Sequence, residues 1–323
     1  MGKNNQFWSK SIFQFTNRRF QATMSKKIKC QKVYRIDHVP GADIPEAEDY
    51  GILQSLEEFD EKGNLILEIG YTRDGDIGDK SEFRFNDSNR VIETLIYGED
   101  DEILERTETI RDQDGRILKE IVHYLDGSSD IRTFIYNEKG SLTGMEVRDD
   151  EDEPDFSERY HYKDDKLVKI ERFDEDNEVV FFQEDNYEDG ILRQRKVWSS
   201  EDEEPFTLIT EFNDKGFREK ETRFDSRDKM TERNIYEADE HGRPWRIIEE
   251  NRLRKNTTEV SFDEKGNMFY QKETDMNGEL NHEIFRTFDD NGNLLSATVE
   301  MVQKNSGEKR AYTMVYRYEY SED

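Results

Sequence analysis

Cysteine is almost absent from this chain of 323 residues. Its single cysteine, Cys30, excludes an internal disulfide framework and any metal site made of cysteines alone. Disulfides are rare in compartments where thiols are kept reduced. The sequence therefore predicts a cytoplasmic protein, and the alternative is a cysteine-poor protein that reaches the cell surface by a non-standard export route.

Long apolar runs are also missing. The run at 179–182 (VVFF) is the longest in the part of the chain expected to fold, whereas a membrane-spanning helix needs about twenty apolar residues. The first forty residues contain no apolar stretch of the length that a secretory signal requires, which is about 7–15 residues. We therefore expect neither a membrane span nor a cleaved leader.

Charge, in contrast, is abundant and mostly of one sign. The chain has 77 acidic and 48 basic residues, a net charge of −29, and only 33% hydrophobic residues. Such a composition is typical of disordered chains. The 20 Phe, 15 Tyr and 3 Trp argue against disorder, because aromatic side chains bury large apolar areas. The arrangement of the residues has to decide between these two interpretations.

An aromatic residue followed by an acidic turn recurs about every 26 residues. The segment FDEKGNL at 59–65 returns as FDEKGNM at 262–268 and as FDDNGNL at 288–294. A second, looser anchor near the middle of each unit divides it into halves with the spacing of short antiparallel strands. The ten main anchors are Phe59, Phe85, Arg111, Tyr136, Tyr162, Tyr187, Phe212, Tyr236, Phe262 and Phe288.

The residues that follow each anchor predict a hairpin turn. Asp or Asn directly after the aromatic can bind the backbone two residues on, and the Gly four positions after it can take a positive φ. Ten units of two strands give about twenty antiparallel strands, and their twist accumulates along the array. We predict an all-β repeat protein of about ten 26-residue units, coiled into an antiparallel β-meander in the form of a spiral or elongated sheet with a concave aromatic face. A five-bladed β-propeller is the alternative. The final alternating strand, 312–320, is predicted to close the last unit as an edge or as a cap.

The segment Phe288-Asp289-Asp290-Asn291-Gly292-Asn293-Leu294 resembles the YD repeat of the Rhs family, whose units read aromatic-Asp-x-x-Gly-x-Leu. The resemblance covers roughly residues 55–300. It implies β-hairpin units that wind into a shell or spiral, as in bacterial polymorphic toxins, wall-associated proteins and teneurins, where the repeats enclose or present other domains and carry no catalysis. The chain lacks the Asp-Pro dipeptide that ends an Rhs core and releases its toxin.

No motif in the sequence points to catalysis. The segments 112–115 and 289–292 are rich in Asp and Asn oxygens and so suggest calcium binding. They lack the distal Glu of an EF-hand loop, and the predicted turns already account for these residues. The five histidines are scattered, without the spacing that would supply two metal ligands from one element. The sequence therefore predicts a protein that is not an enzyme and that has no cofactor and no metal site.

The net charge divides the chain into two parts. Residues 1–36 contain nine basic residues and no acidic one, and because the whole chain carries −29, the rest carries −38. Such asymmetry indicates an interaction tail. We predict a basic N-terminal arm, 1–36, and a β-repeat domain, 37–323. In the arm, helical spacing suggests a partner-binding face, composed of Trp8, Ile12, Phe15, Arg18 and Arg19.

The arm permits three interpretations, namely docking on a partner or on this chain itself, a disordered extension, and a targeting segment. Two acidic loops offer a second docking surface by long-range attraction, although charged loops also keep an open sheet from pairing edge to edge. Their candidate partner-binding residues are Glu151, Asp152, Glu153, Asp202 and Glu203.

Taken together, these features predict a non-catalytic scaffold that binds a protein partner, a basic one where the acidic face is used. Self-association through the arm or through edge strands is a further option. The alternatives are a surface adhesin or carbohydrate-binding protein and, ranked below it, an acidic mimic of nucleic acid. The charge of the body disfavours binding of nucleic acid itself.

Overall fold

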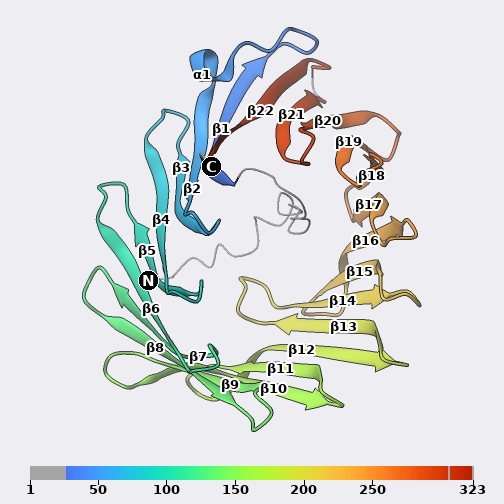
Figure 1. Cartoon of the computed structure of the whole chain (residues 1–323). Helices are drawn as coiled ribbons and strands as arrows, with labels where there is room; N and C mark the ends of the chain where they lie inside the picture. The colour runs from blue at the N-terminus through green and yellow to red at the C-terminus, as the bar shows by residue number, and fades with distance from the viewer. Residues whose placement is uncertain (1–26, 305, 322–323) are drawn as a thin grey trace.

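A computed structural model describes residues 27–304 and 306–321, which form a single antiparallel β-sheet of 22 strands (Figure 1). The first eleven strands are β1 (Ile28–His38), β2 (Ile52–Phe59), β3 (Leu65–Tyr71), β4 (Ile77–Phe85), β5 (Val91–Tyr97), β6 (Ile103–Arg111), β7 (Ile117–Tyr124), β8 (Ser129–Tyr136), β9 (Leu142–Arg148), β10 (Pro154–Lys163) and β11 (Lys166–Phe173). The others are β12 (Val179–Glu188), β13 (Ile191–Ser199), β14 (Phe206–Phe212), β15 (Arg218–Asp225), β16 (Met230–Ala238), β17 (Pro244–Asn251), β18 (Lys255–Phe262), β19 (Met268–Thr274), β20 (Leu280–Phe288), β21 (Leu294–Val302) and β22 (Lys309–Tyr320).

The sheet closes into a barrel because its first strand pairs with its last. β1 lies between β2 and β22, and its register with β22 runs from Ile28 opposite Tyr320 to His38 opposite Ala311. The predicted open spiral and the alternative propeller are therefore both wrong, and β22 is not an edge strand. Closure depends on β1, most of which lies within the stretch 1–36 that the sequence assigned to the arm.

The predicted hairpin turns are confirmed. In the first one, the amide of Asp60 donates to the carbonyl of Asn64 (2.9 Å) and the amide of Gly63 donates to the carbonyl of Asp60 (2.9 Å). The Asp60 carboxylate also accepts the amides of Lys62 and Asn64 at 2.8 and 2.9 Å. Gly63 has a φ of 85°, and Asn89 takes the equivalent position of the next repeat with a φ of 64°. Each repeat therefore fixes its own turn through local hydrogen bonds.

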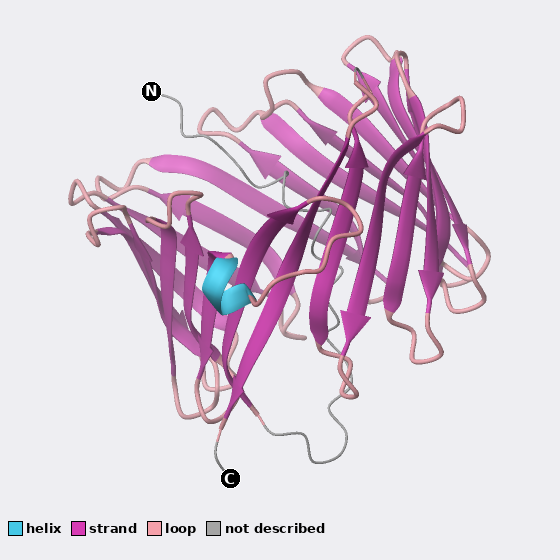
Figure 2. Ribbon diagram, turned by 90° about the horizontal axis from the view of Figure 1, so that it is seen from above, coloured by secondary structure: helices cyan, strands magenta, loops and turns pink. Residues whose placement is uncertain are grey.

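A short helix covers the outer side of the closure. α1 (Ala47–Tyr50) lies outside the ring of strands (Figure 2). Ala47 is completely buried against Ile36 of β1 and Val315 of β22, with Tyr34 packed beside them. This is the one cluster of buried apolar residues found in the described part of the chain. Elsewhere the strands are mostly half-buried, as expected for a single curved sheet.

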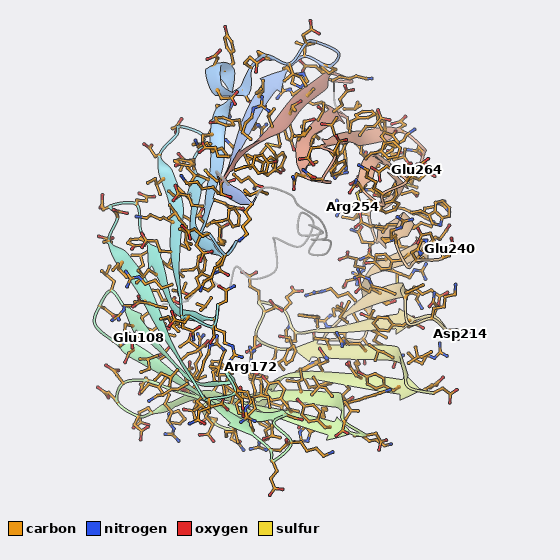
Figure 3. All side chains as sticks on the ribbon, in the orientation of Figure 1. Glu108, Arg172, Asp214, Glu240, Arg254 and Glu264 are labelled. Atoms are coloured by element: carbon orange, nitrogen blue, oxygen red, sulfur yellow. The ribbon has the colours of Figure 1, made fainter. Side chains whose placement is uncertain are left out.

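The register assigns each side chain to the inner or the outer face of the barrel. Residues opposite one another on neighbouring strands share a face, and successive residues of a strand alternate between faces. Arg172 points toward the interior (Figure 3), and its cross-strand partner Glu158 shares that face. Tyr34 and Val315, which contact α1, lie on the opposite, outer face. Because each strand is paired with the next, the same rule assigns the side chains of every other strand of the barrel to a face.

The main aromatic anchors face inward near one mouth of the barrel. We call this rim the first mouth; it carries the turns that follow the anchors, such as 60–64 and 86–90, and the second mouth is the opposite rim. Phe85, for example, faces inward because it directly follows Arg84, which faces outward on β4. Most half-unit anchors point the other way, and among them Trp198 stacks on Phe182 on the outer face, with ring centroids 5.7 Å apart. The expected concave aromatic face is therefore formed by the main anchors together with other inward-facing rings, such as Tyr124, which lies opposite Glu105, and Tyr312 of β22.

Candidate interaction surface

The two predicted acidic loops lie at the second mouth. Residues 149–153 connect β9 to β10 and residues 200–205 connect β13 to β14, so four strands separate the two loops along the rim. Glu151, Asp152 and Glu153 are exposed, as are Asp202 and Glu203. The remaining predicted binding residues, Trp8, Ile12, Phe15, Arg18 and Arg19, lie outside the described residues. The fold thus places the two loops on one rim and does not bring them into contact.

On β10 to β13, inward-facing charges are paired. The Arg172 guanidinium binds the Glu158 carboxylate at 2.6 Å and also reaches Glu201 in the 200–205 loop at 3.0 Å. Arg195 binds Asp185 through two hydrogen bonds of 2.8 and 2.7 Å. The Asp185 side chain is only 2% exposed, so this bidentate pair compensates a carboxylate that has lost its water. In this sector of the barrel wall, each of these inward-facing carboxylates is therefore neutralised by an arginine.

On β2 to β6 the inner face carries carboxylates that have no ion-pair partner among the described residues. Glu57 lies opposite Glu68, and the same row of the sheet passes through Ser81 and Ile96 to Glu105. Asp79 occupies the neighbouring row, opposite Gly70. We call Glu57, Glu68, Asp79 and Glu105 the acidic wall. No basic side chain among the described residues forms an ion pair with any of the four.

At Glu57, the electrostatics of the acidic wall reflect burial and a like-charge neighbour. Burial raises the pKa of Glu57 above the ordinary value of a glutamate, and the neighbouring Glu68 carboxylate raises it further. A like charge and a loss of water both disfavour the ionised form. The wall is therefore a surface that a basic group would stabilise.

A second inward-facing acidic group lies on β16, β17 and β19. Burial raises the pKa of Glu249, and the carboxylates of Glu273 and Glu232 add to the effect. Glu249 lies between Asn234 and Asn256 in the register, so its cross-strand neighbours are amides and not bases.

Sequence reasoning did not find these inner-face carboxylates. In the sequence, Glu57, Glu68 and Glu105 are three of 77 acidic residues, and nothing local distinguishes them from carboxylates on the outer face. Alternation shows that Glu57 and Leu56 point to opposite faces. Which face is the inner one, and which acids share a row, follows from the closure and from the cross-strand register.

The described residues offer no group of three or more histidine, cysteine or acidic side chains placed to hold a metal ion. Within the part of the chain that the structure describes, no helix is both long enough and apolar enough to cross a bilayer. The acidic wall presents fixed carboxylates along a rigid sheet, an arrangement suited to binding cationic groups.

Comparisons with known proteins yield only remote structural likenesses. No family model matches the sequence, and no curated protein matches it. Among solved structures, one described as "TcdB2-TccC3-Cdc42" aligns over 90% of this chain at 10% identity with a TM-score of 0.33. The chain spans only 18% of that structure's length. A porin-like protein from Bacteroides uniformis aligns over 92% of this chain and 100% of its own length, at 11% identity and a TM-score of 0.32.

Likenesses at these scores carry no argument about ancestry or activity. The β-repeat character follows instead from the structure itself, in which the turns recur with the period of the sequence and each repeat supplies two neighbouring antiparallel strands.

Proposed function

We propose that this chain is a non-catalytic interaction protein, built of YD-like hairpin repeats, that binds a basic protein segment on the inner face of its barrel. The observation that carries the proposal is the acidic wall, where Glu57, Glu68 and Glu105 share one row of the sheet without ion-pair partners. Barrels with many more than eight strands are too wide for their own side chains to fill. An extended segment can therefore reach the wall through either mouth.

The N-terminal residues of the chain have the chemistry that such a wall would bind. Residues 1–26 contain five basic and no acidic side chains. The segment that follows them begins at the first mouth next to β2, because Lys27 precedes β1 and its ammonium donates to the carbonyl of Glu61, just after β2. A synthetic peptide with the sequence of residues 1–26 is therefore a suitable probe.

The test measures the fluorescence anisotropy of this labelled peptide with full-length protein at low salt. Replacing Glu57, Glu68 and Glu105 together by Gln removes three charges from the wall. At roughly 0.5 kcal/mol for each charge contact, the affinity should fall about tenfold. Raising the salt concentration should weaken binding to the unaltered protein.

The matched control removes three charges from the outer face by replacing Glu146, Glu259 and Glu300 with Gln. These carboxylates form no ion pair among the described residues, and the register places them outside. We expect this variant to bind the peptide within about twofold of the unaltered protein, because charges on the outer face lie far from the wall and are screened by salt. An equal loss in both triple variants would refute the inner-face site.

A further inference from the structure

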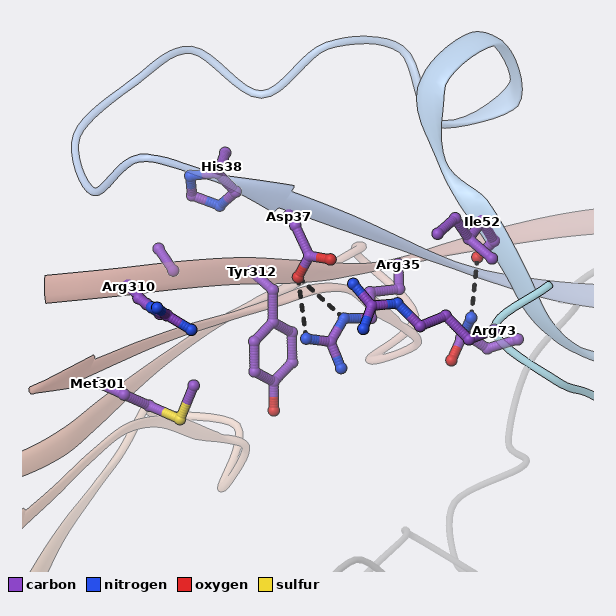
Figure 4. Close-up of a pocket in the computed structure, with 10 residues that line it drawn as sticks. Arg35, Asp37, His38, Ile52, Arg73, Met301, Arg310 and Tyr312 are labelled. Atoms are coloured by element: carbon purple, nitrogen blue, oxygen red, sulfur yellow. Dashed lines mark hydrogen bonds and ion pairs between the residues drawn. The ribbon is translucent and has the colours of Figure 1, made fainter. Parts of the chain in front are cut away.

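At the second mouth, the inner side of the barrel closure contains a hollow of about 480 Å³ (Figure 4). It lies where β1 and β22 meet the turn between β3 and β4. Arg35 and Asp37 come from β1, Tyr312 and Arg310 from β22, and Arg73 from the turn. The register places Arg35, Asp37 and Tyr312 on the inner face. Strands from the two ends of the chain therefore build this hollow together.

Three guanidinium groups line the hollow with one carboxylate among them. The Asp37 carboxylate accepts two hydrogen bonds from Arg35, at 3.0 and 2.8 Å. The Arg35 guanidinium also lies 4.1 Å from the centre of the Tyr312 ring. These contacts fix Arg35 in place. Its orientation is thus set before any ligand arrives.

The other two guanidinium groups have no close carboxylate to neutralise them, although Arg310 donates to the amide oxygen of Gln303 at 3.0–3.3 Å when that amide takes its hydrogen-bonding orientation. Arg73 is exposed and forms no ion pair within the described part of the chain. Arg310 has one acidic neighbour, Glu308, at 3.8 Å, and both of these side chains are about 60% exposed. A pair so long and so exposed is weak. The hollow therefore has an excess of positive charge, although the whole chain is strongly acidic.

A fourth arginine extends this positive surface deeper into the barrel. Arg286 lies in the row of the sheet that leads through Ala297 and Met314 to Arg35. Its Nη2 donates to the amide oxygen of Gln271 at 3.2 Å, and its buried Nη1 has no partner. This surface of the closure is thus opposite in sign to the acidic wall.

We propose that the hollow binds a small molecule carrying a doubly charged oxyanion of the phosphate type. A guanidinium presents paired donors that match the oxygens of phosphate or carboxylate. Arg35, Arg73 and Arg310 against Asp37 leave an excess of two positive charges, which matches a phosphate monoester with a charge near −2. Met301 and Ile52 offer apolar surface for the body of the molecule, and the volume is in the range of small-molecule sites.

The test uses isothermal titration calorimetry on the full-length protein with inorganic phosphate, phenyl phosphate and benzoate as probes. We expect phenyl phosphate to bind more tightly than inorganic phosphate, and benzoate at least tenfold more weakly than phenyl phosphate. Benzoate binding as tightly as phenyl phosphate would overturn the requirement for a double charge. Failure of both phosphates to bind at millimolar concentration would overturn the site.

Two variants locate the binding. Replacing Arg73 and Arg310 together by Gln should weaken the binding of phenyl phosphate at least tenfold. The control replaces Arg227 with Gln. Arg227 is an exposed arginine in another turn of the second mouth, and its replacement should leave the affinity for phenyl phosphate unchanged. An equal loss in the control would show general attraction to the rim and would refute the hollow. Since both exchanged arginines are exposed at the rim, circular dichroism should show unchanged melting in each variant.

Discussion

Single residues in the turns set the conformation of each repeat. Gly63 has a φ of 85° and nothing within 4 Å of the position that a Cβ would occupy. Replacing it with Ala should therefore cost about 1 kcal/mol, from the backbone conformation alone. Replacement with Asn should cost less, because Asn89 already takes a φ of 64° in the equivalent position. Urea unfolding of the two variants checks the order, and an Ala variant as stable as the unaltered protein would contradict it.

The buried pair of Asp185 and Arg195 should be a point of high sensitivity. Replacing Arg195 with Met leaves a carboxylate that is 2% exposed without its partner, and losses of about 3–5 kcal/mol are typical of such changes. The control is Lys139→Met, which breaks a pair with Asp165 in which both side chains are more than 70% exposed. That loss should stay below about 1 kcal/mol. Chemical denaturation measures both, and similar losses would show that burial does not determine the cost.

Glu57 should make stability depend on pH. Its raised pKa means that the folded state binds its proton more tightly than the unfolded chain, whose glutamates titrate near about 4.3. Ionisation of Glu57 above its folded pKa therefore costs stability, and the cost disappears below the unfolded value. Glu57→Gln should melt at a higher temperature than the unaltered protein near neutral pH and at the same temperature near pH 4.

The outer-face variant Glu259→Gln provides the control for this comparison, because Glu259 is exposed. Its melting temperature should differ little from that of the unaltered protein at either pH. A stabilisation by Glu57→Gln that is equally large at pH 4 would contradict the electrostatic explanation.

At the scale of elements, β1 and β22 behave differently in an open and in a closed sheet. In an open meander both would be edge strands, with one row of amides facing solvent. In the barrel each has two neighbours, and Val33 of β1 lies between Ser55 and Tyr316. We expect the amides of 30–37 and 311–319 to exchange hydrogen as slowly as those of β18. Fast exchange in both strands would indicate an open sheet.

The hairpins were largely predictable from the sequence because their determinants are local. The main anchors, the Asp or Asn after them and the positive-φ residue lie within five positions of one another, so a single-sequence pattern contains the whole turn. β1 was missed because it has no repeat motif and lies in a stretch dominated by basic residues. The pairing through which β1 closes the barrel is with β22, almost three hundred residues away.

At the scale of the whole molecule, closure can be tested with one substitution. Cys30 on β1 lies opposite Glu319 on β22, and opposed residues of antiparallel strands have Cα atoms about 4.5–5.5 Å apart, which a disulfide can bridge. In Glu319→Cys, mild oxidation should link the two ends of the chain and shift its migration on a non-reducing gel.

Glu300→Cys is the control, since it places a second thiol on the same outer face of β21, away from Cys30. It should stay unlinked within the molecule under the same oxidation. An unlinked Glu319→Cys variant would contradict the pairing of β1 with β22.

The sequence by itself determined the repeat, the turns and the alternation of faces, because each depends on residues close together in the chain. It also contained the division between a basic N-terminal segment and an acidic remainder. The tertiary structure decided that the array closes, and closure defines an inner face. Only then do Glu57, Glu68 and Glu105 become neighbours in one row, and only then do Arg35, Arg73 and Arg310 surround one hollow. Accumulated strand twist and the pairing of distant ends bring these residues together, and neither leaves a local pattern in the sequence.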